Sequence, residues 1–170
     1  MTELLTAFGP LVCEGTRLVI LGSFPGVASL RAHQYYGHPR NDFWKIFEAI
    51  WPLSASAVGA NCYQIRSAAL LKAGLGLWDV YASCERVGSL DSQIRQPALN
   101  DLQILRQRCP QLQAIAHNGG ESFKHSKHSK ELGVPVYRLP STSPANASWS
   151  FERKLAAWRE VFDKHGLITD

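Results

Sequence analysis

Short aliphatic runs alternate with helical patterns along the chain, and this alternation limits the possible folds more than any other feature. Four runs have the length and composition of buried strands, at residues 17–22, 76–81, 112–117 and 134–139. Apolar residues recur at helical spacing in 41–51, 63–73, 99–108, 121–132 and 150–165. Strands that alternate with helices in this way usually pair in parallel, with helices on both faces of the sheet. The sequence therefore predicts an α/β fold.

The size of the chain fits one domain. It has 170 residues, 45% of them hydrophobic, which is enough for a core without disulfide or metal support. No apolar run approaches the ~20 residues of a membrane span. Residues 1–10 lack the basic segment and apolar core of a secretion signal. We expect a single domain over residues 1–170 that works as a cytoplasmic monomer and has no membrane partner.

Charge and cysteine content narrow the function. Lys and Arg number 18 against 14 for Asp and Glu, a mild basic bias that permits a nucleic-acid partner without demonstrating one. No two of the four cysteines form the C-x-x-C pair that is usual in zinc and iron–sulfur sites. We therefore expect reduced thiols, no metal and no cofactor.

The expected sheet also predicts where a ligand binds. In open parallel sheets, ligands bind beyond the carboxyl ends of the strands. Four polar or Gly/Pro-rich segments follow the predicted strands, at 23–26, 79–83, 118–120 and 141–148. One cleft could be lined by all four segments.

The segment 33–44 is rich in groups that suit nucleic-acid chemistry. It places two Tyr, two His, an Arg, an Asn, a Phe and a Trp within twelve positions. Aromatic rings stack on bases, and polar side chains read base edges. Asn41 has two interpretations, because it also stands just before a helical stripe of Phe43, Ile46, Phe47 and Ile50, where asparagine commonly caps a helix.

The remaining polar positions also have two interpretations each. Asp79 ends an apolar run, so its carboxylate either caps a turn or points into the cleft. The small and hydroxyl residues of 141–148 suit either a loop that grips DNA phosphates or a plain surface loop. The basic stretch 124–130 is typical of a solvated helix face. The sequence has no Ser-His-Asp order and no H-E-x-x-H motif, so the candidate site is poor in strong bases.

Five segments together resemble the uracil-DNA glycosylase superfamily, and most closely its hypoxanthine-DNA (deoxyinosine) glycosylase branch, family 6. They are GSFPG at 22–26, YYGHPRNDFW at 35–44, LWDV at 77–80, NG at 118–119 and STSPAN at 141–146. The resemblance spans about residues 18–158, and its second segment is the most specific. It implies a three-layer αβα sandwich around a short four-stranded parallel sheet.

The resemblance also implies an activity. It implies a monofunctional enzyme of base excision repair that hydrolyses the N-glycosidic bond of deaminated bases in DNA, chiefly hypoxanthine. Uracil, xanthine and ethenoadenine stay open as further substrates, as does single-stranded beside double-stranded DNA. The alternative is a non-catalytic DNA-binding module that uses the same cleft.

Roles for single residues follow from the matched motifs. Asn41 matches the catalytic asparagine of this branch, and Phe24 stands where several uracil-removing relatives have an acidic or amide residue. The expected base-binding residues are Ser23, Phe24, Phe43, Asp79 and Asn118. The expected DNA-binding residues are Gly26, Tyr36, His38, Arg40, Ser141, Ser143, Pro144, Ala145 and Asn146. The last motif lacks its usual histidine, and His117 stands where an apolar or aromatic residue is expected, which leaves its role open.

Overall fold

A four-stranded parallel sheet forms the centre of the protein. The computed structural model describes residues 3–53 and 62–169. The sheet has the order β3-β2-β6-β7, and all three pairings are parallel. Its strands are β2 (Leu18–Gly22), β3 (Leu75–Asp79), β6 (Ala114–Asn118) and β7 (Val136–Leu139). The predicted number and direction of these strands are confirmed.

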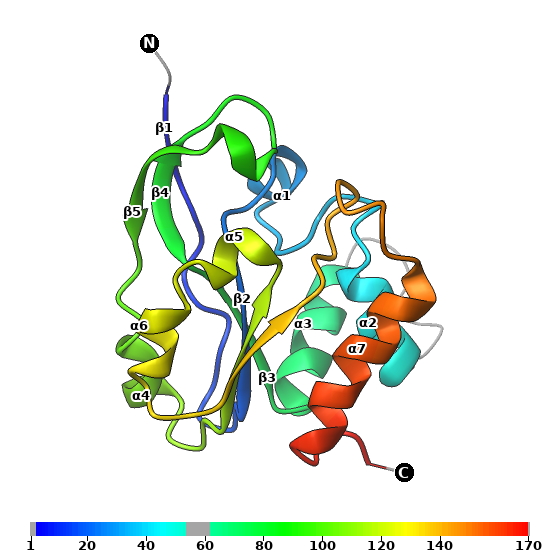
Figure 1. Cartoon of the computed structure of the whole chain (residues 1–170). Helices are drawn as coiled ribbons and strands as arrows, with labels where there is room; N and C mark the ends of the chain where they lie inside the picture. The colour runs from blue at the N-terminus through cyan, green and yellow to red at the C-terminus, as the bar shows by residue number, and fades with distance from the viewer. Residues whose placement is uncertain (1–2, 54–61, 170) are drawn as a thin grey trace.

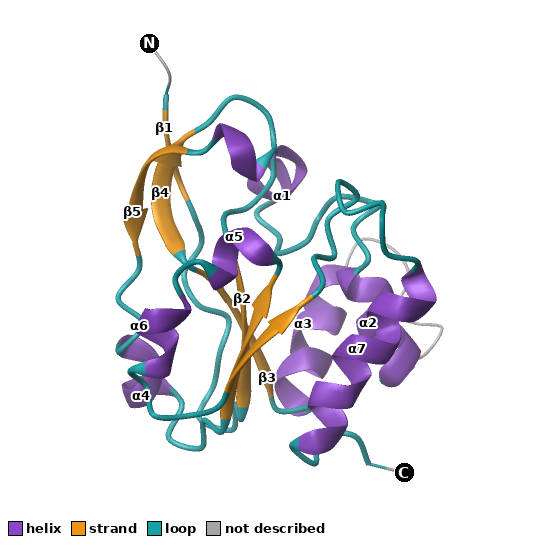
Figure 2. Ribbon diagram, in the orientation of Figure 1, coloured by secondary structure: helices purple, strands orange, loops and turns teal. Residues whose placement is uncertain are grey.

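Helices cover both faces of the sheet, as Figures 1 and 2 show. One layer contains α2 (Phe43–Ile50), α3 (Cys62–Lys72) and α7 (Phe151–Lys164). The other contains α4 (Ile104–Arg108), α5 (Gly120–Phe123) and α6 (Ser126–Lys130). This arrangement confirms the three-layer sandwich.

The side chains of β2 alternate between the two faces of the sheet and contribute to a hydrophobic core on each face. Leu18 and Ile20 point into the core shared with α2, α3 and α7, whereas Val19 and Leu21 point into the core beneath α4. All four side chains are fully buried. Burial on both faces explains why β2 is a continuous aliphatic run, and each side chain contributes about 1.5–3 kcal/mol.

A second sheet was not expected from the sequence. It is antiparallel, has the order β1-β4-β5, and consists of β1 (Leu4–Thr6), β4 (Tyr81–Glu85) and β5 (Arg95–Leu99). β4 begins two residues after β3, so the predicted strand 76–81 contains parts of both. The loop between β4 and β5 returns beside α1 (Val27–Ala32) at the end of the molecule where the parallel strands finish (Figure 1).

Two helical predictions need correction. The predicted helix 99–108 begins only at Ile104, because Leu99 is the last residue of β5. The predicted basic helix 121–132 is two short helices, α5 and α6, which is consistent with a segment rich in weak helix formers such as serine and histidine. The other predicted helices agree with α2, α3 and α7, and the Ser150 hydroxyl caps α7 by accepting from the Arg153 N–H at 3.2 Å.

Within the described ranges, no helix has both the length and the apolar character needed to cross a bilayer. Cys13, Cys62, Cys84 and Cys109 are free thiols.

Candidate active site

A cavity of about 820 Å³ opens at the carboxyl ends of the parallel strands. All four predicted segments contribute to its lining, although Asp79 is the only residue of 79–83 that does so. Residues 89–92, from the loop between β4 and β5, complete one wall. The sequence placed Ser89 and Asp91 in the candidate segment that continues from residues 77–81, without assigning them a role, and the antiparallel sheet is what brings them to the cavity.

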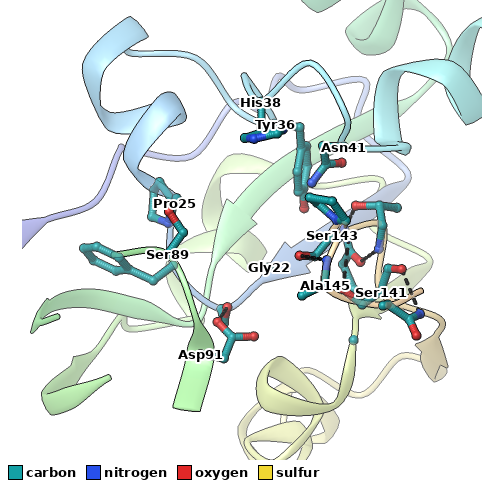
Figure 3. Close-up of a pocket in the computed structure, with 18 of the residues that line it drawn as sticks. Gly22, Pro25, Tyr36, His38, Asn41, Ser89, Asp91, Ser141, Ser143 and Ala145 are labelled. Carbon is teal, nitrogen blue, oxygen red and sulfur yellow. Dashed lines mark hydrogen bonds between the residues drawn. The ribbon is translucent and has the colours of Figure 1, made fainter. Parts of the chain in front are cut away.

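Asn41 lies at the cavity, one residue before the N-cap of α2. Its Oδ1 accepts the Phe43 backbone N–H at 2.9 Å, so the carboxamide is fixed relative to the helix. Asp42 is the N-cap residue and its side chain makes no capping bond. Both interpretations of Asn41 therefore hold in part: it supports the start of the helix, and it lines the cavity (Figure 3).

Asp79 is a buried acid at the end of β3. Its side chain is 4% exposed, and its Oδ2 has no hydrogen-bond partner among the described residues. Burial is the main reason that the pKa of Asp79 rises to about 7; the charge of Asp91 adds to the rise and Arg86 opposes it. A Cβ on Gly22 would come within 2.5 Å of Asp79 Oδ1, so only glycine at this position leaves room for the carboxylate.

Tyr36, and not Phe43, presents an aromatic ring to the cavity. Phe43 is 1% exposed and packs in the core behind Tyr36, with the two ring centroids 4.4 Å apart. The expectation that Phe43 stacks on a base is therefore wrong in position, because α2 turns this residue inward with the rest of its apolar stripe. Phe24 does line the cavity, and the guanidinium of Arg86 lies 5.2 Å from its ring centre.

The turn 22–26 is held by the loop after β4. The Ser23 hydroxyl donates to Asp91 Oδ1 at 2.7 Å, and the Val27 N–H donates to the Ser89 hydroxyl at 2.9 Å. Arg86, 5% exposed, donates to the Pro25 carbonyl at 2.6 Å. These bonds fix the wall of the cavity that contains Ser23, Phe24 and Gly26.

The opposite wall is the loop 140–146, and Asn118 secures it. The Asn118 carboxamide accepts the Thr142 N–H at 3.0 Å and donates to the Thr142 hydroxyl at 2.9 Å. Asn118 therefore holds the loop in place and also lines the cavity; its expected contact with the base stays a prediction, because the carboxamide keeps one N–H and one lone pair beyond these bonds. Ser141, Ser143, Pro144, Ala145 and Asn146 all line the cavity, as Figure 3 shows for three of them.

Comparison with known proteins identifies the family. Residues 10–162 match the family model described as the uracil DNA glycosylase superfamily. The chain belongs to the uracil DNA glycosylase superfamily. Two relatives are named hypoxanthine DNA glycosylase. The protein from Methanosarcina barkeri is 36% identical over 92% of this chain and 97% of its own length, and that from Methanosarcina acetivorans is 35% identical over 91% and 96%.

A solved structure supports the same family. The solution NMR structure of a candidate uracil DNA glycosylase from Methanosarcina acetivorans matches this chain with a TM-score of 0.82 and 32% identity. The match covers 95% of this chain and 98% of that one. The uracil DNA glycosylase fold expected from the five sequence segments is therefore confirmed.

His38 and Arg40, both expected to bind DNA, differ in whether they reach the cavity. His38 lines it, and its Nδ1 accepts the Arg40 N–H at 3.0 Å. Arg40 is exposed and lies outside the lining, so any contact it makes with DNA is on the outer surface.

His117 lies in the protein core and outside the cavity lining. It is fully buried on β6, with Nδ1 and Nε2 each 2.7 Å from a hydroxyl, those of Ser122 and Ser129. The Ser122 proton goes to the Leu21 carbonyl, so Nδ1 must donate and Nε2 must accept. Burial lowers the pKa of His117 to about 4, and the neutral ring fastens α5 and α6 to the sheet.

Proposed function

We propose that this protein is a monofunctional DNA glycosylase that hydrolyses the N-glycosidic bond of deaminated bases in DNA, hypoxanthine first. Asn41 carries the proposal: a tethered carboxamide lines a cavity of about 820 Å³ on a uracil DNA glycosylase scaffold. The names of the two Methanosarcina relatives support hypoxanthine as the main substrate.

The base must leave the duplex before it can reach this cavity. Extrusion requires a few kcal/mol, and less for a mismatched base such as hypoxanthine opposite thymine. The loop 140–146 and the turn 22–26 face each other across the opening, and we assign them the contacts to the strand that carries the extruded nucleotide. Their hydroxyl and amide groups are of the kind that bind DNA phosphates.

Asn41 positions the attacking water. Its Oδ1 already accepts the Phe43 N–H, which fixes the plane of the amide and leaves the second lone pair for a water proton. The water oxygen bonds to C1′ as the bond from C1′ to the base breaks, and the bonding electrons leave with the base. The attacking water loses a proton to solvent, and the leaving base takes one up from solvent. An amide is not a strong base, so catalysis depends on positioning and on stabilising the cationic sugar.

The same lining explains why we propose hydrolysis without strand cleavage. A glycosylase that also cleaves the strand needs an amine to form a Schiff base with the sugar. Within the described part of the chain, no lysine belongs to the cavity lining, and the buried Lys154 is paired with Asp42 at 2.9 Å.

The test is excision from a panel of duplexes, each with one modified base, and mass detection of the released base. Wild type should release hypoxanthine and leave an intact abasic strand. Asn41→Ala should keep DNA affinity but slow single-turnover release about 100-fold or more, the scale of losing one preorganised group. Arg159→Ala, an exposed change on α7, is the control.

Three outcomes would contradict the proposal. Binding without release of any base by wild type would indicate a DNA-binding module. Near-normal release by Asn41→Ala would remove Asn41 from the mechanism. Strand cleavage at the abasic site would show that the enzyme is not monofunctional. Uracil duplexes and single-stranded substrates in the panel define the substrate range.

A further inference from the structure

The rim of the cavity carries an exposed leucine, Leu90. Among the described residues, the exposed large apolar side chains are Leu4, Val87, Leu90, Leu99 and Ile104. Of these, Leu90 alone lines the cavity, and it is 54% exposed. A single exposed leucine is ordinary on a protein surface. The position of Leu90 at the mouth of the cavity, and the way it is held there, distinguish it from the others.

Leu90 stands between two anchored neighbours. On one side, the Ser89 hydroxyl accepts the Val27 N–H at 2.9 Å. On the other side, Asp91 Oδ1 accepts the Ser23 hydroxyl at 2.7 Å. Figure 3 shows both neighbours beside the cavity. A side chain on an anchored backbone loses less conformational freedom when a partner covers it, so Leu90 is well prepared for binding.

A buried arginine supports the start of the same loop. Arg86 is 5% exposed, and it donates to the Gly88 carbonyl at 2.7 Å and to the Pro25 carbonyl at 2.6 Å. Gly88 has φ 76°, in the left-handed region that favours glycine, so the chain can turn sharply there. Residues 87–92 are all exposed. The loop is therefore a projection that stands in solvent on a fixed base.

The opposite wall of the cavity offers no comparable side chain. The loop 140–146 has the sequence PSTSPAN, in which every side chain is small or polar. Trp149 also lines the cavity, but it is half-buried, and the guanidinium of Arg153 lies 4.3 Å from its ring centre. Leu90 is thus the exposed aliphatic side chain that the described part of the rim presents to a bound strand.

We propose that Leu90 enters the DNA duplex and fills the gap that the extruded nucleotide leaves. This inference rests on the proposed function and adds the residue that holds the duplex open. When a base leaves the stack, the bases next to it lose stacking contacts and its partner loses hydrogen bonds. An apolar side chain inserted between base steps replaces part of the lost contact. Leu90 leaves water in the same event, so both surfaces gain from the insertion.

The proposal predicts which substrates depend on Leu90. Hypoxanthine paired with cytosine leaves a gap when it is extruded. A bulged hypoxanthine, an extra nucleotide without a partner, leaves none, because the flanking pairs stack on each other. A single strand has no duplex to hold open. A residue that only shaped the cavity would affect all three substrates, so their comparison separates the filling of a gap from a general effect on the site.

The experiment measures single-turnover release of hypoxanthine from these three substrates. Leu90→Ala should slow release from the paired duplex about 10- to 50-fold, the effect of removing about three apolar carbon groups from a buried contact. Release from the bulge and from the single strand should fall less than about 3-fold, because no gap is filled there. Leu90→Met should stay within about 3-fold of wild type on every substrate, because methionine has a similar volume.

Leu99→Ala is the matched control. It makes the same change at a leucine that is 43% exposed, on β5 and outside the cavity lining. This variant should leave release from all three substrates unchanged. A loss on the paired duplex equal to that of Leu90→Ala would show that the effect does not belong to the rim of the cavity, and would overturn the inference.

The outcomes separate this inference from the proposed function. If wild type releases no hypoxanthine from any substrate, the proposed function fails. If wild type releases hypoxanthine but Leu90→Ala slows all three substrates equally, or slows none, the role of Leu90 is refuted and the proposed function stands. Where release from the bulge or the single strand is too slow to follow, affinities for the same substrates with a hydrolysis-resistant 2′-fluoroarabinose sugar give the comparison. Leu90→Ala should then weaken binding to the paired duplex alone.

Discussion

Replacing Asp79 by asparagine should stabilise the folded protein above neutral pH. The wild-type carboxylate is 4% exposed, and its Oδ2 has no partner among the described residues. Burial raises its pKa to about 7, from 3.8 for the free side chain. Ionising Asp79 therefore opposes folding, and asparagine has the same shape without the charge.

The magnitude follows from the shift in pKa. A rise from 3.8 to about 7 is about three pKa units, and at 1.36 kcal/mol per unit this amounts to about 4 kcal/mol. Because the folded pKa is the higher one, this stability is fully present below pH 3.8 and is lost as pH rises through 7. The buried amide hydrogens of asparagine take back about 1–2 kcal/mol. The expected net gain at pH 8 is about 2–3 kcal/mol.

The assay is urea unfolding of wild type and Asp79→Asn at several pH values between 4 and 9. The difference in free energy of unfolding should increase with pH and level off above about pH 8. Asp163→Asn, an exposed change on α7, is the matched control and should show no such increase. A difference that stays constant with pH, or a variant less stable than wild type at pH 8, would refute the reasoning.

Three further predictions test other parts of the structure. Burial lowers the pKa of His117 to about 4, so the neutral ring stabilises the fold fully above pH 6.5 and this stability is lost as pH falls toward 4. Urea unfolding of wild type should therefore show a loss of about 3 kcal/mol over this pH range. The variant His117→Asn should lack this loss. Lys154→Met should reduce stability by about 2–3 kcal/mol by leaving Asp42 unpaired, and adding Asp42→Asn should restore part of it. If Asp79 binds the base as expected, its ionised carboxylate accepts an N–H of hypoxanthine, so single-turnover release should rise with pH through about 7; a flat profile would contradict that expectation.

The parallel sheet could be predicted because three of its four strands, β2, β3 and β6, are almost entirely buried. Burial on both faces requires continuous aliphatic runs such as residues 18–21, and these are visible without any knowledge of the partners. The antiparallel sheet has no comparable signal. All five residues of β5 are exposed and one of them is proline, while β1 has only three residues. For the same reason the sequence, which included Ser89 and Asp91 in a candidate segment, could not show that the loop 89–92 forms a wall of the cavity.

The site residues differ in how far the sequence could place them. Phe43 was expected to stack on a base, yet it belongs to the apolar stripe with Ile46 and Phe47, and that stripe already predicted its burial. The bonds of Asn118 to Thr142 could not be predicted, because they join it to a residue 24 positions away in sequence. Tyr36 has a left-handed backbone conformation, with φ 55°, and no local rule predicts it for a tyrosine.

The effect of Asp79 on folding stability and its expected contact with the base depend on the same free energy, that of a buried carboxylate whose Oδ2 has no partner among the described residues. A carboxylate that lacks a partner in the free protein gains one when N1–H of the base arrives, so the binding of the base relieves the cost that ionisation imposes. Asparagine has no charge and so lacks this cost of ionisation, and it therefore gains less free energy when the base binds. Duplex DNA containing uncleavable hypoxanthine should thus raise the unfolding temperature of wild type more than that of Asp79→Asn, whereas undamaged duplex should affect the two equally.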